Sequence, residues 1–170
     1  MTDDAGTPLA SRPFMPGYGI AGPDEGSGLL PWTWAEQRLT MSHDYWVATV
    51  WPDGRPHVTP VWGVWADVAF WFSSSSGSRK ARNLGREARA TAATDDALHP
   101  VMVDGTVTRV VAPERVAWFA DLVNDKYTTS YPVEFFTANA CFRLAPRSVV
   151  GLDTDDFEGS PTRWTFPGEG

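Results

Sequence analysis

The 170-residue chain has a single cysteine, Cys141, and therefore cannot form an internal disulfide bond. Cys141 lies in an apolar stretch, 140–144, that is typical of a strand, and we expect it to be a small buried side chain. The three histidines, His43, His57 and His99, lie far apart, with no cysteine or carboxylate at zinc-ligand spacing. The sequence therefore predicts no structural metal.

Long apolar runs and an excess of basic residues are also missing. No run approaches the roughly 18 apolar residues of a membrane span, and Asp3 and Asp4 stand where a secretory signal would carry Lys or Arg. We therefore expect a cytoplasmic protein without a membrane partner. The net charge of −7 argues against a nucleic-acid partner, because such proteins usually present a basic face.

Common catalytic motifs are absent as well. The spacing of a Walker loop does not occur, no G-x-G-x-x-G opens a helix, and no G-x-S-x-G is present. Gly77 occupies the position three before Lys80, which excludes an S-x-x-K motif. Since no serine is paired with a histidine at a recognisable spacing, the sequence identifies no catalytic residue.

Aromatic residues, in contrast, are plentiful, and they include nine Trp in one chain of single-domain length. This abundance indicates that the chain packs or binds flat ring systems. Residues 1–28 are crowded with Gly and Pro and have little apolar periodicity, which predicts a flexible N-terminal arm. A single domain is then expected over residues 29–170.

The domain is expected to consist mainly of strands with short connections. Helices are expected from Pro31, from Ser78 to Leu84 and from Pro113. The expected strands are 45–50, 56–65, 68–73, 89–94, 101–111 (broken at Asp104-Gly105), 140–150 and 163–166. Because no βαβ rhythm appears, the pattern favours an antiparallel barrel with attached helices over a parallel sheet.

The segment 72–84 is the most informative about function. It places a run of serines and a glycine between a strand end and a helix capped by Ser78, with Arg79 and Lys80 in the first helical turn. Cations at that end oppose the helix dipole, so a bound phosphate would explain them. A solvated basic helix face behind a serine-rich loop is the alternative interpretation.

The second candidate is the strand around Pro60. A proline inside a strand cannot donate to the ladder, so this strand should lie at an edge or carry a bulge. Backbone groups left unpaired there could bind the polar edge of a heterocycle while Trp62 covers the ring. An edge strand with ordinary aromatic core residues is the alternative, and the sequence leaves both open.

Several of these segments, taken in order, resemble the pyridoxamine 5′-phosphate oxidase-like superfamily. The segments are 31–34, 45–50, 53–57, 60–62, 70–73 and 78–84. The closing segment 159–166 is similar to the C-terminal signature of the flavin/deazaflavin oxidoreductase B branch. The resemblance covers about residues 29 to 166, so it is far more specific than any single motif.

The resemblance implies a mainly β fold, a six-stranded antiparallel split β-barrel with a few peripheral helices, which forms a homodimer with cofactor sites at the subunit interface. The residues implied to line the cofactor ring through their backbone are Thr59, Pro60, Val61 and Trp62. Those implied to meet the ribityl chain and phosphate are Ser73, Ser74, Ser78, Arg79, Lys80 and Asn83.

Three functional hypotheses follow from the resemblance. The favoured one is an oxidoreductase that uses the deazaflavin coenzyme F420 to transfer hydride to a small conjugated organic substrate. The second is an FMN-dependent oxidase or reductase, and the third is a non-catalytic carrier of a flavin, a deazaflavin or a haem-like pigment. Arg163 and Tyr127 are considered as substrate-side groups, although structural roles are favoured for both.

Overall fold

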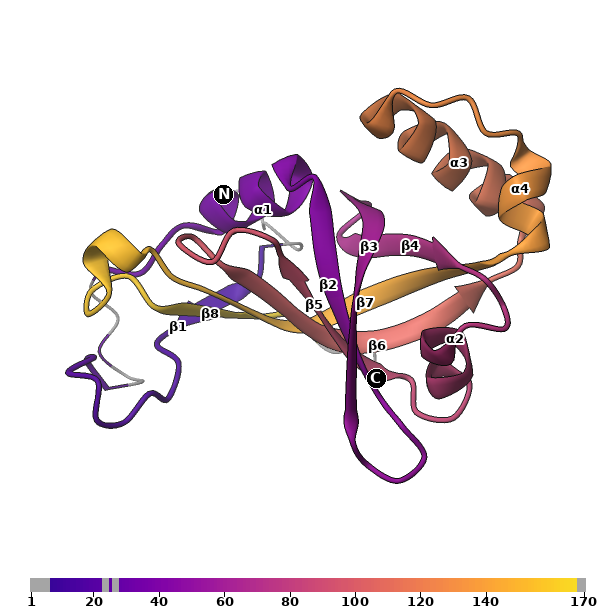
Figure 1. Cartoon of the computed structure of the whole chain (residues 1–170). Helices are drawn as coiled ribbons and strands as arrows, with labels where there is room; N and C mark the ends of the chain where they lie inside the picture. The colour runs from indigo at the N-terminus through magenta and orange to yellow at the C-terminus, as the bar shows by residue number, and fades with distance from the viewer. Residues whose placement is uncertain (1–6, 23–24, 26–27, 168–170) are drawn as a thin grey trace.

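The computed structural model describes residues 7–22, 25 and 28–167. Its strands form one antiparallel sheet in the order β1-β8-β7-β4-β3-β2-β5-β6, and β6 also pairs with β7. This last pairing closes the six strands from β2 to β7 into a barrel (Figure 1). The strands are β1 Leu9–Ser11, β2 Asp44–Val50, β3 Pro56–Ala66, β4 Ala69–Ser74, β5 Arg89–Thr94, β6 Val101–Val110, β7 Ala140–Gly151 and β8 Thr162–Thr165.

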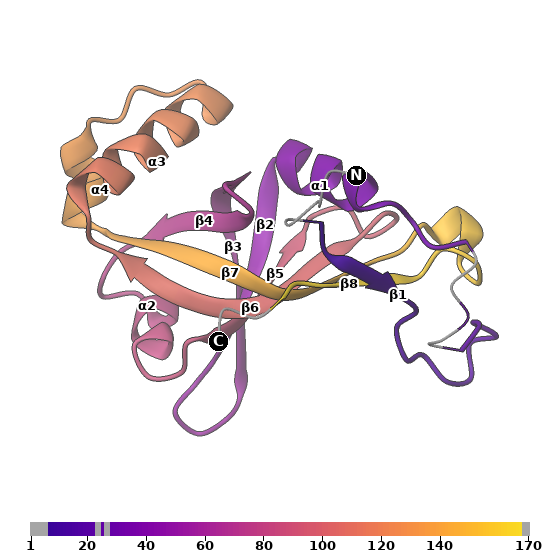
Figure 2. The same cartoon turned by 180° about the vertical axis from the view of Figure 1, so that it is seen from behind.

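Four α-helices lie around the barrel in the described part of the chain. They are α1 Trp32–Met41, α2 Arg79–Leu84, α3 Pro113–Tyr127 and α4 Val133–Ala138. Both ribbon views show α3 and α4 side by side beyond β3 and β4, with α1 toward the opposite end of the barrel (Figures 1 and 2). Within the described residues, no helix has the length and apolar character that would let it cross a membrane.

Alternating side chains fill the barrel, as a sheet with one buried face requires. Strand β4 is apolar on both faces: Phe70 and Phe72 point into the barrel core, while Trp71 packs in a second cluster under α3 and α4. Cys141 belongs to this second cluster, and burial raises the pKa of its thiol to about 11. The prediction that Cys141 is a small buried side chain is thus confirmed.

The predicted mainly β barrel with peripheral helices is confirmed, and most predicted elements match the observed ones within a residue or two. The break expected at Asp104-Gly105 is a bulge in the pairing with β7, and β6 continues through it. Helix α4 was not predicted, because six residues after Pro132 are too few to show a helical period.

Part of the predicted N-terminal arm is attached to the barrel. Strand β1 pairs with β8, and the nearly fully buried Arg12 donates hydrogen bonds to the carbonyl oxygens of Gly159 and Pro161, each at 2.8 Å. A three-residue strand has too little pattern to be read from sequence. Residues 1–6, 23–24 and 26–27 of the predicted arm lie outside the described residues, and the boundary at residue 28 stays a prediction.

Candidate functional site

The two ends of β3 have different partners. Residues 56–62 pair with β2 on one side, whereas β4 pairs only with residues 63–66. The backbone of residues 56–62 is therefore a free edge on the side away from β2, within the part of the chain that the structure describes. Pro60 lies in this stretch, as its missing N–H requires, so the prediction of an edge at this position is confirmed.

Side chains alternate along the free stretch of β3. Val58, Pro60 and Trp62 are exposed on the outer surface, while Thr59 and Val61 point toward the barrel. The ring of Trp62 stacks on Tyr127 of α3, with ring centroids 4.3 Å apart and planes 6° apart. The free edge is thus bordered by a flat aromatic side chain whose orientation is held by a second ring.

Helix α2 begins beside this edge, where β4 ends. Ser78 caps the helix through its side-chain oxygen, which accepts a hydrogen bond from the backbone N–H of Ala81 at 3.2 Å. The Ser74 hydroxyl donates to the Ser78 oxygen at 2.9 Å, and the ammonium of Lys80 donates to the Ser74 oxygen at 3.2 Å. The predicted cap is confirmed, and three predicted site residues, Ser74, Ser78 and Lys80, lie together.

The ammonium of Lys80 is partly removed from water. Burial lowers the pKa of Lys80 below its ordinary value, which means that its positive charge is poorly solvated. The described residues offer it no carboxylate, so an anion beside it would stabilise the charge.

The neighbouring cation, Arg79, points in another direction. Its guanidinium lies over the ring of Trp51, 3.9 Å from the centroid, and Arg55 lies over the same ring at 4.2 Å. Arg79 is therefore directed toward the β2–β3 hairpin and not onto the serines. Ser73 also lies apart from the serine cluster, because it faces a cavity under α3 and α4.

Asn83 and Thr59 carry buried polar atoms without partners. The amide nitrogen of Asn83 donates to the Thr49 hydroxyl at 3.0 Å, but the amide oxygen has no hydrogen-bond partner among the described residues. The Thr59 hydroxyl oxygen is likewise buried and unpaired. A buried polar atom without a partner costs about 1–3 kcal/mol, so each of these oxygens would gain from a hydrogen-bond donor that reaches it.

The group around Asn83 also includes residues that the sequence did not single out. Thr49 faces inward on β2, opposite His57 on β3, and its hydroxyl lies 3.5 Å from the Nδ1 of His57. The signal was present in the alternation of β2, which places Thr49 on the same face as Val47. Nothing in the sequence, however, brought Asn83 to that face.

Most of the chain also matches a known protein family. The family model for pyridoxamine 5′-phosphate oxidase matches residues 35–159, which is more than two thirds of the chain. The chain belongs to this family.

Solved structures with a similar fold include proteins with different roles. A conserved hypothetical protein from Mycobacterium tuberculosis is 24% identical, with a TM-score of 0.67 over 74% of this chain and 86% of that one. An F420 reductase is 22% identical, with a TM-score of 0.56 over 67% of this chain and 94% of that one. HutZ, a haem storage protein from Vibrio cholerae, is 18% identical, with a TM-score of 0.55 over 66% of this chain and 84% of that one. At these identities the likeness shows the fold alone, and a search of curated proteins gives no significant match.

In this family member, a broad groove of about 750 Å³ lies on the outer barrel surface. It is bordered by Arg89, Arg147 and Arg163. Arg89 forms an ion pair with Glu87, with a nitrogen–oxygen distance of 2.7 Å. Arg163, considered above as a substrate-side group, is exposed on β8 and borders this groove. Its lining also includes the carboxylates of Glu87 and Asp104, and Thr49, which accepts a hydrogen bond from Asn83 of α2. None of the clustered residues Ser74, Ser78 and Lys80 is among its lining residues.

Tyr127, the other residue considered as a substrate-side group, has a structural role in the described contacts. Its hydroxyl accepts a hydrogen bond from the backbone N–H of Gly63 at 2.9 Å and donates to the carbonyl of His43 at 2.6 Å. Burial raises the pKa of Tyr127 to about 12. Tyr127 therefore fixes α3 to β3 and supports Trp62.

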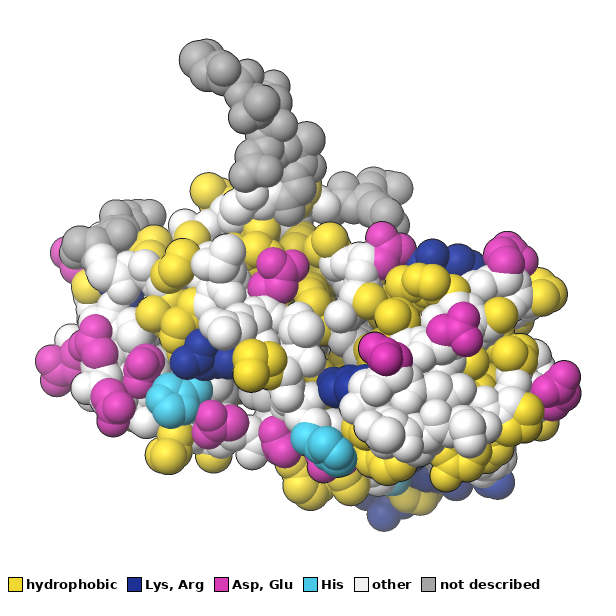
Figure 3. All heavy atoms as spheres, turned by 90° about the horizontal axis from the view of Figure 1, so that it is seen from above, with side chains coloured by type: hydrophobic (Ala, Val, Ile, Leu, Met, Phe, Trp, Pro, Cys, Tyr) yellow, Lys and Arg dark blue, Asp and Glu magenta, His cyan; other side chains and the backbone are white. Residues whose placement is uncertain are grey.

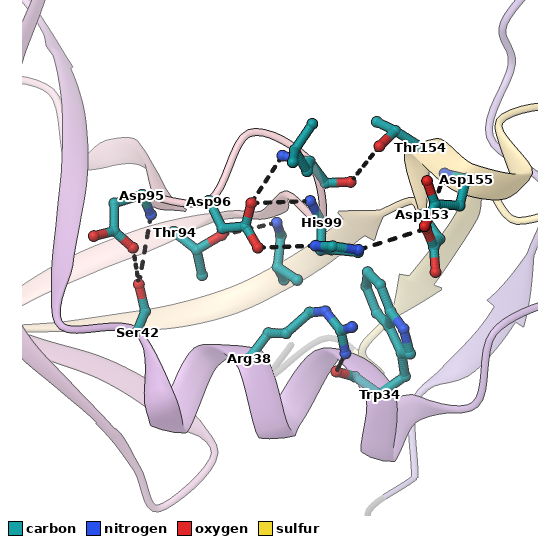
Figure 4. A network of polar contacts seen from close by, with 12 residues as sticks. Trp34, Arg38, Ser42, Thr94, Asp95, Asp96, His99, Asp153, Thr154 and Asp155 are labelled. Carbon is teal, nitrogen blue, oxygen red and sulfur yellow. Dashed lines mark hydrogen bonds and ion pairs between the residues drawn. The ribbon is translucent and has the colours of Figure 1, made fainter.

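The fold also gathers groups that are distant in sequence around His99 (Figure 4). Its Nδ1 lies 3.0 Å from Asp96, its Nε2 lies 3.7 Å from Asp153, and ligand atoms of His99, Asp153 and Asp155 lie within 4.8 Å of one another. Carboxylates therefore do surround this histidine: Asp96 lies three residues before it in the sequence, whereas Asp153 and Asp155 come from a distant segment. These contacts tie the loop after β5 to the 3-10 turn Thr154–Asp156, at an end of the molecule rich in acidic side chains (Figure 3).

Proposed function

We propose that this chain is a flavin-type oxidoreductase that binds coenzyme F420 between the free edge of β3 and the start of α2, and transfers hydride to a small conjugated organic substrate. Membership of the family supports the flavin-type chemistry. The observation that carries the proposal is the cluster of Ser74, Ser78 and Lys80 at the start of α2. The buried oxygens of Asn83 and Thr59, which have no hydrogen-bond partner among the described residues, add to it.

Each predicted residue has a role under this proposal. The backbone groups of residues 59–62 meet the polar edge of the cofactor ring, because no strand pairs with them on that side. The residues proposed for the ribityl chain and phosphate are Ser74, Ser78, Lys80 and Asn83, together with Ser73 and Arg79, which lie apart from the serine cluster in this structure. The bound cofactor supplies the hydride chemistry, and the chain's residues bind it, orient it and exclude water.

Lys80 has the most specific part in binding. Its partly desolvated ammonium donates a hydrogen bond to Ser74 near the N-terminus of α2, so a phosphate there would gain charge-assisted hydrogen bonds. The guanidinium of Arg79 makes a cation–π contact with Trp51. To bind the cofactor, Arg79 would either leave this contact or approach the cofactor from the β2–β3 hairpin.

We further propose that the protein is a homodimer with its cofactor sites at the subunit interface. The outer face of β2 and β3 exposes Trp46, Val58 and Trp62 to between 43% and 53%. Trp46 pairs across the ladder with Pro60, so these apolar side chains form one continuous patch. A patch of this kind usually marks an interaction surface.

Two other functions remain to be distinguished by experiment. An FMN-dependent enzyme would use the same polar groups, and the similarity to a haem storage protein supports a pigment carrier as a candidate. The three differ in their expected behaviour. An F420 enzyme binds F420 more tightly than FMN and oxidises the reduced cofactor when an acceptor is added, whereas a carrier binds a pigment without turnover.

The decisive experiment titrates the purified protein with F420, FMN and haem in parallel, following quenching of Trp fluorescence. Replacing both Arg79 and Lys80 by Ala should weaken F420 affinity more than tenfold, since hydrogen bonds to charged groups contribute roughly 1.5–3 kcal/mol each. The matched control is the double substitution Arg147→Ala and Arg163→Ala, which removes the same charge from the outer groove and should leave the affinity within twofold. If the Arg147 and Arg163 variant instead loses F420 affinity and the Arg79 and Lys80 variant keeps it, the cofactor binds in the outer groove.

A further inference from the structure

A cavity of about 210 Å³ lies between the barrel and the helix pair α3 and α4. Its apolar and aromatic lining is formed by Trp62, Phe119, Val123, Tyr131, Phe135 and Phe136. Ser73 contributes a hydroxyl, and no Lys, Arg, Asp, Glu or His is among the described lining residues. The cavity is thus an aromatic chamber with few polar groups.

The position of the cavity follows from the end of the β3–β4 ladder. The last recorded pair is Gly63 with Phe72, and the next pair in register would be Trp62 with Ser73. These two residues instead separate and line the cavity. Trp62 belongs to the residues assigned to the cofactor ring and Ser73 to those assigned to the ribityl chain, so the cavity borders the proposed cofactor site.

The walls of the cavity are held at defined angles. Tyr131 and Phe135 stack with centroids 4.8 Å apart, and Phe135 meets Phe136 edge to face at 5.3 Å. Phe119 and Phe136, which are almost completely buried, form its inner side. The outer wall of Tyr131 and Phe135 is more than 40% exposed, which leaves a route from solvent.

The loop that carries Tyr131 is fixed to α3 through one side chain. The amide of Asn124 donates to the Tyr131 carbonyl at 2.9 Å and accepts from the Tyr131 N–H at 2.9 Å. On the opposite side, Tyr127 supports the ring of Trp62. Both aromatic walls are therefore set in place by contacts outside the cavity, a feature of sites that are largely formed before a ligand binds.

We propose that this cavity is the substrate pocket and that it takes neutral, planar aromatic or conjugated molecules of one or two rings; the assignment as substrate pocket rests on the proposed function. Its volume is about seven times the ~30 Å³ share of one water molecule, which limits the size of the occupant. Flat rings gain from stacking on the aromatic walls. A carboxylate is disfavoured because no lining cation would compensate for its lost hydration.

The test uses two probes with the same ring system, 2-naphthol and 2-naphthoate, titrated into the full chain without cofactor by calorimetry. The neutral probe should bind at least tenfold more tightly than the anion. Phe135→Ala should weaken 2-naphthol binding at least fivefold and leave F420 affinity within twofold. The matched control is Phe157→Ala, which removes a partly exposed phenylalanine outside the cavity and should change neither affinity.

Thermal unfolding followed by circular dichroism shows whether Phe135→Ala folds, and Phe135→Leu provides a second variant with an apolar side chain. Equal affinity for the two probes, or 2-naphthol binding that neither Phe135 variant changes, would overturn the pocket assignment. If F420 binds but 2-naphthol does not, the pocket fails and the cofactor proposal survives. If 2-naphthol binds but no cofactor does, the proposed function fails, and with it the assignment as a substrate pocket.

Discussion

The two stretches of β3 are built from similar residues but lie in different surroundings. Residues 63–66 pair with β4, and Val64 and Trp65 are buried. Residues 56–62 pair with β2 alone and expose Val58, Pro60 and Trp62. The first stretch serves the core, whereas the second leaves backbone and aromatic groups available to another molecule.

This difference separates stability from binding along one strand. Substitutions at the buried stretch and its partners should cost folding free energy, because packing there is complete. Substitutions on the outer face of the free stretch should cost little, since the removed atoms already contact water. Four experiments test this contrast, and the first has the largest expected effect.

Phe70→Ala should have the largest effect, a loss of about 3–5 kcal/mol in the free energy of unfolding. Phe70 is fully buried, pairs with Trp65 of β3 and packs against Tyr45 with centroids 4.6 Å apart. The matched control is Val58→Ala on the free stretch, which should cost less than about 0.5 kcal/mol. Chemical denaturation of both variants measures the difference, and equal losses would contradict the contrast.

Gly63→Ala should destabilise the protein by about 1–3 kcal/mol, because the added methyl group overpacks the core. Its Cβ would collide with the Phe70 ring and lie 2.8 Å from the carbonyl oxygen of Trp71. Gly77→Ala is the control, since its Cβ would meet only the Ser75 hydroxyl at 3.8 Å. If Gly63→Ala unfolds at the same temperature as the wild type, the expected overpacking between the two stretches of β3 does not occur.

Ser78→Ala should cost about 1 kcal/mol of stability through loss of the α2 cap, and it should also weaken cofactor binding. Ser78→Asp keeps a capping oxygen but adds a negative charge. It should therefore retain stability and lose cofactor affinity. Thermal unfolding and F420 titration separate the two effects, and full cofactor affinity in Ser78→Asp would remove the phosphate from this position.

The smallest effect concerns pH and Lys126, which donates to the Gly63 carbonyl at 2.9 Å and to the Tyr45 hydroxyl at 2.8 Å. Burial lowers the pKa of Lys126 to about 8 in the folded chain, whereas the unfolded chain keeps its ordinary value near 10.5. Between these values the unfolded chain binds more protons, so stability should rise with pH. Relative to Lys126→Met, the wild type should gain stability from pH 7 to 9.5, and a constant difference would contradict this.

Local patterns predicted most elements of this fold. The β-branched and aromatic runs indicated the strands, Pro52-Asp53-Gly54 indicated the first hairpin turn, and Ser78 indicated the start of α2. Each of these signals acts over a few residues and needs no distant contact. Helix α4 escaped prediction because it has hardly more than one turn and owes its position to packing against α3.

The candidate site was predicted in part. Serines 74 and 78 and Lys80 lie within one local turn, so the sequence could place them together. The partners of Asn83 and Trp62 could not be predicted, because Thr49 and Tyr127 lie more than 30 residues away in the chain. The role of Arg79 toward Trp51 is likewise visible only after the hairpin and the helix meet.

The strands, the turns and the capped basic helix follow from local sequence, because they depend on side-chain alternation and on the backbone preferences of neighbouring residues. Three features depend on tertiary contacts: the pairing of β6 with β7 that closes the barrel, the separation of β3 and β4 beyond the Gly63–Phe72 pair, and, among the described residues, two buried side-chain oxygens without a hydrogen-bond partner. Ladders and cavities arise between segments distant in the chain, where packing and not local preference selects the contacts.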